Sequence, residues 1–163
     1  MSFQEIEQLI IEILGNEVIV ESKTDVLQPY MAVSKDNLLR VCSLLKEDKR
    51  CYFDYLNCLS GVDNGVEANT FTVVYHLISI IYSHRIVLKC TIERADEAEI
   101  PSISSIWRAA DWHEREIFDL FGIKFKGHPN LKRILLPDDW EGHPLRKDYL
   151  EAEQYQGIKI KSE

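Results

Sequence analysis

The sequence predicts a two-layer α+β domain, a mostly antiparallel or mixed sheet with helices on one face, followed by an irregular, extended C-terminal segment. The element order supports this, because a helix, a strand and a second helix precede three strands whose short connections favour antiparallel pairing. In residues 83–93, apolar and polar residues alternate as in a strand with one buried face. The Gly and Pro residues after Gly122 prevent any long helix. We therefore divide the chain into a scaffold domain, residues 1–122, and an extended segment, residues 123–163.

The first helix is recognised by its ends. Ser2 and Glu5 form a capping box, the apolar residues that follow recur at helical spacing, and Gly15 is a typical C-terminal stop. Residues 17–21 are then a short strand candidate, and residues 30–33 are a second one.

A second helix and three strands are expected next. Ser34 is the expected cap of a helix that carries its apolar residues on one side. Strands are expected at residues 51–59, 71–80 and 83–93. The Gly- and Asn-containing stretch 61–65 indicates a turn between the first two of them.

Two helical segments are expected before the chain becomes irregular. The first opens at Pro101, and its apolar side comprises Ile103, Ile106 and Trp107. The second begins at Asp111 as its cap, ends at Gly122, and places Arg115 and Asp119 as partners at i,i+4 spacing. Its charges fit either a solvated face opposite a core stripe or an interface, since apolar positions nearly encircle this helix. The polar tail after Tyr149 is expected to be loose.

The charge balance narrows the class of partner. A net charge of −8 over 163 residues argues against nucleic-acid binding, because nucleic-acid binders carry a basic surplus. Residues 124–147 nevertheless contain six Lys or Arg against three acids, a strip that can steer the chain to an acidic partner. No apolar run approaches the roughly 20 residues that a membrane helix needs, so no membrane span is expected.

Motifs for metals and cofactors are missing from the sequence. The four cysteines lack the close pairs of zinc and iron–sulfur sites, so we expect reduced, buried thiols at Cys42, Cys51, Cys58 and Cys90. Neither a phosphate-cradling glycine loop, nor a nucleophile elbow, nor the HExxH motif occurs. His128 and His143 each precede Pro, which suits turns or interfaces better than metal ligation.

The C-terminal third resembles a known family. The residues that carry the resemblance are Glu114-Arg115-Glu116, Asp119-Leu120-Phe121-Gly122, His128-Pro129, Lys132-Arg133-Ile134-Leu135 and Gly142-His143-Pro144-Leu145-Arg146-Lys147-Asp148-Tyr149, with Ile100-Pro101-Ser102 and Trp107 upstream. They resemble the signature of one subunit of bacterial NADH–quinone oxidoreductase (respiratory complex I), the subunit designated C, whose family includes the mitochondrial thirty-kilodalton subunit and its chloroplast counterpart, designated J. The resemblance is dense over residues 100–149 and diffuse before them. The short tail resembles the family members that are not fused to the quinone-site subunit.

The resemblance implies a non-catalytic scaffold subunit of the hydrophilic arm, which supports electron transfer from NADH to quinone coupled to ion translocation. It implies no cofactor in this chain: flavin and iron–sulfur clusters belong to partner subunits, and NADH and quinone are substrates of the complex. The implied partners are the quinone-site subunit, designated D in the same family, and neighbouring iron–sulfur subunits. The implied location is peripheral, on the cytoplasmic face of the bacterial inner membrane.

Under this interpretation the segment from residue 112 to residue 149 is a docking segment rather than an active site. Its expected docking residues are Glu114, Arg115, Glu116, Asp119, Gly122, His128, Pro129, Arg133, Trp140, Pro144, Leu145, Arg146, Lys147 and Asp148.

Two alternatives remain at this point. The chain can be the equivalent subunit of a membrane-bound hydrogenase or of a dehydrogenase that uses ferredoxin or a deazaflavin, since the motif separates these poorly. It can also be a small stand-alone enzyme in which His113, Glu114 and Glu116 perform acid–base chemistry, which requires a pocket that shifts their pKa values.

Overall fold

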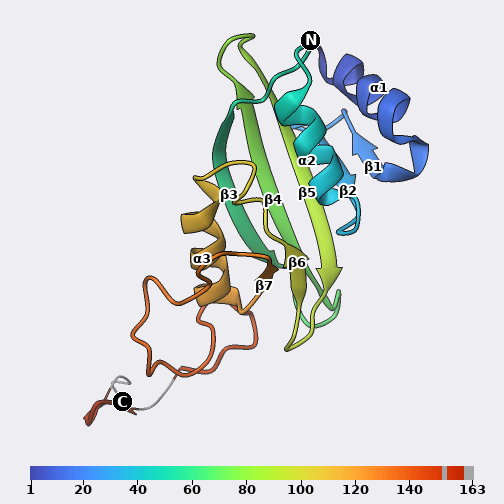
Figure 1. Cartoon of the computed structure of the whole chain (residues 1–163). Helices are drawn as coiled ribbons and strands as arrows, with labels where there is room; N and C mark the ends of the chain where they lie inside the picture. Colours follow the sequence, from blue (N-terminus) through green and yellow to red (C-terminus); the bar gives the residue numbers. More distant parts are fainter. Residues whose placement is uncertain (152–153, 160–163) are drawn as a thin grey trace.

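The fold is a two-layer α+β arrangement, seen in a computed structural model that describes residues 1–151 and 154–159 (Figure 1). A five-stranded mixed sheet has the strand order β1-β2-β5-β4-β3, in which only β2 and β5 pair in parallel. The elements are α1 Phe3–Leu14, β1 Ile19–Lys23, β2 Tyr30–Val33, α2 Leu38–Glu47, β3 Tyr55–Asp63, β4 Thr70–Ser79, β5 His84–Glu93, β6 Glu99–Pro101, α3 Ala110–Phe121, β7 Lys124–Lys126, β8 Gln154–Tyr155 and β9 Ile158–Lys159. The predicted fold class is confirmed.

All three helices contribute to one core on one face of the sheet. As Figure 1 shows, α2 lies across the sheet near β5, α1 lies beside α2 towards the β1 edge, and α3 packs beside β3. Their buried residues join Tyr75, Leu77 and Leu88 of the sheet in a single hydrophobic cluster. In the part of the chain that the structure describes, no helix covers the opposite face of the sheet.

The first helix has the predicted ends. The Ser2 hydroxyl accepts from the Glu5 amide at 3.2 Å, and the Glu5 carboxylate accepts from the Ser2 amide at 2.6 Å, which completes the capping box. Gly15 ends the helix with φ +98°, a conformation that favours glycine.

Several predicted boundaries are wrong by a few residues. The first strand begins at Ile19, because Asn16–Val18 forms a 3₁₀ turn. The third strand runs from Tyr55 to Asp63 instead of over residues 51–59. The amides of residues 51–53 donate instead to carbonyls at the end of α2, those of Leu45 and Asp48. The predicted turn at 61–65 is partly strand.

Gly61 explains this last error. It lies inside β3 and faces α3, where an added Cβ would be 2.9 Å from the Phe121 ring and 3.1 Å from the Ile117 side chain. The glycine therefore allows close helix–sheet packing and does not mark a turn. The turn itself follows, between Asp63 and Thr70.

Three helix predictions also need correction. Ser34 does not cap α2; its hydroxyl accepts from the Asn37 amide side chain at 3.1 Å, and the helix begins after Asn37. The region after Pro101 forms turns instead of a helix, although Ile103 and Trp107 are buried as expected. The last helix begins at Ala110 without a side-chain cap, so Asp111 lies in its first turn.

The extended segment is tied to the domain by a second small sheet. β7 pairs in parallel with β6, aligning Ile100 with Phe125, and both side chains are buried. Further along, β8 and β9 form a short hairpin, whereas the sequence predicts a loose tail there. Residues 152–153 and 160–163 of the predicted segment lie outside the described residues.

Replacing Gly61 with Val is expected to destabilise the fold by about 1–3 kcal/mol, because the new methyl groups overpack the contact with Phe121. Chemical denaturation of the purified chain measures this loss. Val62→Thr, at the neighbouring position of β3 whose side chain is 41% exposed, is the matched control and should change stability by less than about 0.5 kcal/mol. Equal stability of the two variants would contradict the packing role of Gly61.

Candidate docking surface

Helix α3 organises the predicted docking segment, because each of its sides makes a different contact. Ile117 and Phe121 pack on β3. Glu114 points towards the chain after β6, and Asp119 points towards residues 133–136.

The Asp119 carboxylate is a buried anchor for the extended segment. One oxygen, Oδ2, accepts from three consecutive amides, Ile134 at 3.0 Å, Leu135 at 2.8 Å and Leu136 at 2.9 Å. The other oxygen accepts from the Arg133 guanidinium at 2.7 Å. Burial by itself raises the pKa of Asp119, but these donors overcome it and hold the pKa below its usual value. Asp119 is therefore an anion at neutral pH.

The same segment satisfies the carbonyl groups at the end of α3. His143 Nδ1 lies 2.9 Å from the Asp119 carbonyl oxygen, and the Leu145 amide donates to the Leu120 carbonyl at 3.0 Å. The Arg146 guanidinium donates to the Phe121 carbonyl at 2.6 Å. These carbonyls have no helical partner, and cations stabilise the negative end of a helix.

Gly122 makes this arrangement possible. It ends α3 in the left-handed conformation with φ +73°. An added Cβ would lie 2.5 Å from His143 Nε2 and 2.6 Å from Arg146 Nη2. Only glycine lets both side chains reach the helix end.

Arg133 closes the loop that follows it. Its second nitrogen, Nη2, donates to the carbonyls of Trp140 at 3.0 Å and Gly142 at 3.1 Å. Arg115 supports the loop from the helix by donating to the carbonyls of Lys132 and Arg133, both at 3.2 Å. The predicted pairing of Arg115 with Asp119 is wrong, because Asp119 is bound by Arg133 and three amides while Arg115 points to carbonyls.

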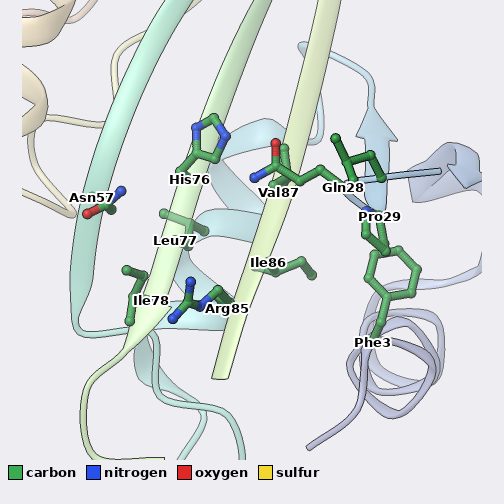
Figure 2. Close-up of a pocket in the computed structure, with 11 residues that line it drawn as sticks. Phe3, Gln28, Pro29, Asn57, His76, Leu77, Ile78, Arg85, Ile86 and Val87 are labelled. Carbon is green, nitrogen blue, oxygen red and sulfur yellow. The ribbon is translucent and has the colours of Figure 1, made fainter. Parts of the chain in front are cut away.

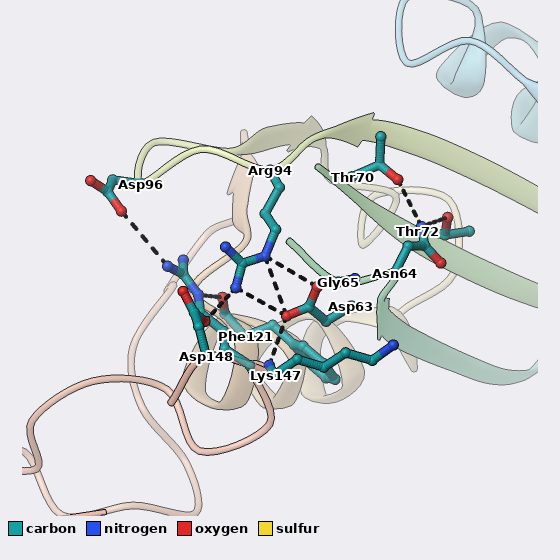
Figure 3. A network of polar contacts seen from close by, with 11 residues as sticks. Asp63, Asn64, Gly65, Thr70, Thr72, Arg94, Asp96, Phe121, Lys147 and Asp148 are labelled. Atoms are coloured by element: carbon teal, nitrogen blue, oxygen red, sulfur yellow. Dashed lines mark hydrogen bonds and ion pairs between the residues drawn. The ribbon is translucent and has the colours of Figure 1, made fainter. Parts of the chain in front are cut away.

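A second anchor joins the segment to the ends of β3 and β5 (Figure 3). Asp63, at the end of β3, accepts from the amides of Gly65 and Lys147, both at 2.8 Å, and from the Arg94 guanidinium at 3.1 Å. Arg94 also pairs with Asp148. Burial alone would raise the pKa of Asp63. The hydrogen bonds from Arg94 and from the two amides lower it by more, so the pKa lies below its usual value.

Glu114 is a third buried carboxylate, with a different environment. It accepts from the Ser102 hydroxyl at 2.5 Å and from the Ile103 amide at 2.7 Å. His128 Nε2 lies 3.9 Å from it, and this histidine also contacts the Asp111 carbonyl at 3.1 Å. Desolvation by burial outweighs these two hydrogen bonds and raises the pKa of Glu114 to about 7.

Most of the positive charge of the basic strip, residues 124–147, is paired with acidic side chains of the same chain. Four of its six cations have an acidic partner: Lys124 with Glu97, Lys126 with Glu99, Arg133 with Asp119, and Arg146 with Asp96. The strip therefore presents less free positive charge than the sequence indicates.

Large apolar side chains remain exposed on α3 and on the segment bound to it. Among them, Trp112 is 63% exposed, Leu135 61% and Leu145 52%. Leu145 also lines a groove of about 330 Å³ between β3 and α3, which includes His113 and Glu116. Exposed aromatic and aliphatic side chains on an ordered surface are typical of docking sites.

The remaining predicted residues differ in their exposure and contacts. The Trp140 ring lies 5.2 Å from the Tyr155 ring, and its buried Nε1 has no hydrogen-bond partner in the described ranges. Pro129 is exposed and Pro144 is half-buried. The Lys147 side chain is exposed while its amide binds Asp63.

The predicted acid–base trio does not converge. His113 and Glu116 line the groove beside β3, whereas Glu114 is fully buried on another side of α3. Over residues 1–151 and 154–159, no group of three or more His, Cys, Asp or Glu side chains is placed to hold a metal ion. Within the same ranges, no helix has the length and hydropathy of a membrane span.

Asp63 and Arg94 were not identified from the sequence. Asp63 lies in the stretch that was interpreted as a turn, and Arg94 directly follows the expected strand 83–93. Their partners Lys147 and Asp148 are distant in the sequence. Ser102 was assigned to a helix start, but its hydroxyl binds Glu114. An acid directly followed by a turn signal, as in Asp63-Asn64-Gly65, is a weak indication of such a site.

Comparison with known proteins identifies close sequence relatives. Residues 31–155 match the family model described as respiratory-chain NADH dehydrogenase, 30 Kd subunit. A protein from Chloroherpeton thalassium, named as the NADH-quinone oxidoreductase subunit designated C, is 45% identical over 82% of this chain, which spans only 55% of that relative. One of the same name from Chlorobium phaeobacteroides is 39% identical, with 91% of this chain and 89% of the relative covered.

A solved structure shares the fold at lower identity. It is titled as the membrane-bound sulfane sulfur reductase, an archaeal respiratory membrane complex. One of its chains matches with a TM-score of 0.70 and 24% identity, covering 90% of this chain and 84% of that chain. This likeness concerns the fold alone.

Replacing Asp119 with Asn is expected to destabilise the chain by about 3 kcal/mol, because an amide nitrogen then faces donors that need an anion. Chemical denaturation measures the loss, and hydrogen exchange should show faster exchange at the amides of residues 134–136. Glu116→Gln, an exposed change on the same helix, is the control and should stay within about 0.5 kcal/mol. Unchanged protection of those amides would contradict the anchor role.

Stability is expected to fall as pH rises from about 5 to about 8, because of Glu114. Its pKa is about 7 in the folded chain against 4.5 for the free group, so the folded state binds the proton more tightly. Above the unfolded pKa this preference costs up to about 3 kcal/mol. Denaturation of the wild type and of Glu114→Gln at both pH values measures it, since the variant lacks the titration. Parallel pH profiles would show that Glu114 does not titrate in this window.

Proposed function

Since the chain belongs to the family of the 30 Kd subunit of respiratory-chain NADH dehydrogenase, we propose that it is a structural subunit of the hydrophilic arm of an NADH–quinone oxidoreductase. The complex as a whole transfers electrons from NADH to quinone and couples this transfer to ion translocation. The role of this chain is to hold other subunits in place. The names of the relatives that are 39–48% identical to it support this proposal.

The observation that carries the proposal is the contrast between the buried charges and the exposed apolar groups of one surface. Asp119, Arg133 and Arg146 are bound inside the chain and fix the path of the extended segment. Trp112 and Leu135 are left exposed on the surface that results. Because the internal bonds already fix the segment, binding another protein through the exposed apolar side chains would cost little conformational entropy. Such a surface is suited to contact with a partner.

The motif residues then have two roles. Those that bind carbonyls or carboxylates within the chain, such as Arg115, His143 and Asp148, position the segment. Those with exposed side chains, such as Glu116 and Lys147, contact the partner. We assign the contact to the quinone-site subunit and to neighbouring iron–sulfur subunits.

The remaining parts of the proposal concern the whole assembly. Flavin and iron–sulfur clusters belong to the partner subunits, and this chain contributes no catalytic group of its own. The assembly lies on the cytoplasmic face of the bacterial membrane, with this chain as a peripheral subunit. The sulfane sulfur reductase complex contains a chain of the same fold, so the electron-input module distinguishes the two kinds of machine.

Purification of the tagged chain from native membranes tests the proposal. We expect the quinone-site subunit and a flavin-bearing NADH module to co-purify, together with NADH:quinone reductase activity. Co-purification of a hydrogenase or of a ferredoxin-linked module without flavin-bearing NADH subunits would reject NADH as the donor. A chain that purifies alone would reject the scaffold role.

Leu135→Lys tests the surface itself. Burying a lysine ammonium in an interface requires its desolvation, so we expect the amount of assembled complex to fall at least tenfold, roughly 1.4 kcal/mol. Ile80→Lys is the matched control, because Ile80 is 62% exposed against 61% for Leu135 and lies in the turn between β4 and β5. Thermal unfolding of both free chains checks that each variant folds. Normal assembly of Leu135→Lys would place the interface elsewhere.

A further inference from the structure

The face of the sheet opposite the helices carries a pocket of about 400 Å³ (Figure 2). Its floor is formed by β4 and β5, one wall by β3, and the other by residues 27–29 and Phe3. The docking surface around α3 lies on the other face, where Ile117 packs on Gly61. The two sites are therefore separate.

Polar side chains from three adjacent strands line this pocket. Asn57 comes from β3, His76 from β4 and Arg85 from β5, and Gln28 adds an amide from the opposite wall, as Figure 2 shows. The pairing of β3 with β4 shifts register between Leu56 and Cys58, so Asn57 is an extra residue in the strand. Such a bulge redirects a side chain, here towards the pocket.

The charge of the pocket is opposite to that of the chain. None of its lining residues is Asp or Glu, whereas the chain carries a net charge of −8. Within the described residues, Arg85 makes no ion pair or side-chain hydrogen bond, and it is exposed. An arginine left free among neutral amides is a suitable partner for an anion.

His76 adds a second polar group without an internal partner. Its Nδ1 is buried and forms no hydrogen bond in the described part of the chain. No internal bond therefore fixes which ring nitrogen carries the proton, and the ring can present an N–H to an incoming acceptor. Ile78 and Val87 provide apolar surface beside it.

This combination selects one kind of anion. A nucleic acid or a membrane surface requires several cations in a row, and the pocket has a single guanidinium. A carboxylate matches one guanidinium in a two-point contact, and the neutral amides can donate further bonds. The volume of about 400 Å³ lies at the small end of the range for ligand pockets, and it is large enough for a side chain and its neighbours.

We propose that this pocket receives an Asp or Glu side chain from a short segment of another subunit, with Arg85 as the main contact and Asn57 and His76 as supporting donors. The identity of the donor as a subunit rests on the proposed function. The chain then joins the assembly at two sites on opposite faces of its sheet.

A photo-reactive residue at position 57 in the assembled complex identifies the occupant. We expect a cross-link to a segment of another subunit that contains Asp or Glu. We expect Arg85→Glu to lower the yield of complex at least tenfold, and the exchange of that partner acid for Lys to restore it. Arg40→Glu, the same charge change on the exposed side of α2, is the control and should assemble normally. A cross-link to a segment without acids, or equal yields for the two variants, would overturn the proposal.

A titration of the free chain gives a test that does not depend on the complex. The probes are acetyl-Ala-Glu-Ala-amide, its Gln counterpart and inorganic phosphate, followed by NMR at the side chains of His76 and Arg85. We expect saturable shifts with the Glu peptide alone, absent in Arg85→Glu. Equal binding of phosphate, or no binding of the Glu peptide, would overturn the pocket as a docking site. If no NADH-module subunits co-purify with the wild type, the proposed function fails, and the titration alone decides on the pocket.

Discussion

The last turn of α3 leaves carbonyl groups without helical partners, and much of the C-terminal structure follows from satisfying them. The carbonyls of Asp119, Leu120 and Phe121 are bound by His143, the amide of residue 145 and Arg146. A buried carbonyl without a donor reduces the free energy of unfolding by about 1–3 kcal/mol. Detaching the segment would break several such bonds at once. The Asp119 carboxylate adds three amides and a guanidinium from the same segment. The segment is therefore irregular in its backbone and yet fixed in position.

The high density of charge, Gly and Pro in the motif reflects this internal task. Arg133 binds four acceptors on α3 and on its own loop, and Gly122 gives the arginine and histidine near it the space to approach. In a compact domain such groups usually face solvent, whereas here many are buried or half-buried. We infer that the buried and half-buried charged residues of the motif act on partners indirectly, by fixing the surface that exposes the side chains of Trp112 and Leu135.

Local signals in the sequence were sufficient for the fold class and for several element ends. The capping box at Ser2 and the alternation in β5 depend on neighbours within a few residues, and the structure has both. The sequence did not reveal why Gly61 is a glycine, because the reason is the ring of Phe121. It also assigned Asp119 to Arg115 by spacing, whereas three amides aimed at one oxygen are visible only in three dimensions. Contacts between distant residues were the ones missed.

The bond from the Lys147 amide to Asp63 joins residues that are 84 positions apart. Bringing such distant points together costs chain entropy, which is recovered only when the strands that hold Asp63 and Arg94 are already in place. The end of the segment therefore orders after the sheet. During synthesis residue 148 also emerges late, so a nascent chain has its core before it has the proposed docking surface. A partner that recognised the proposed surface would accordingly select completed, folded subunits.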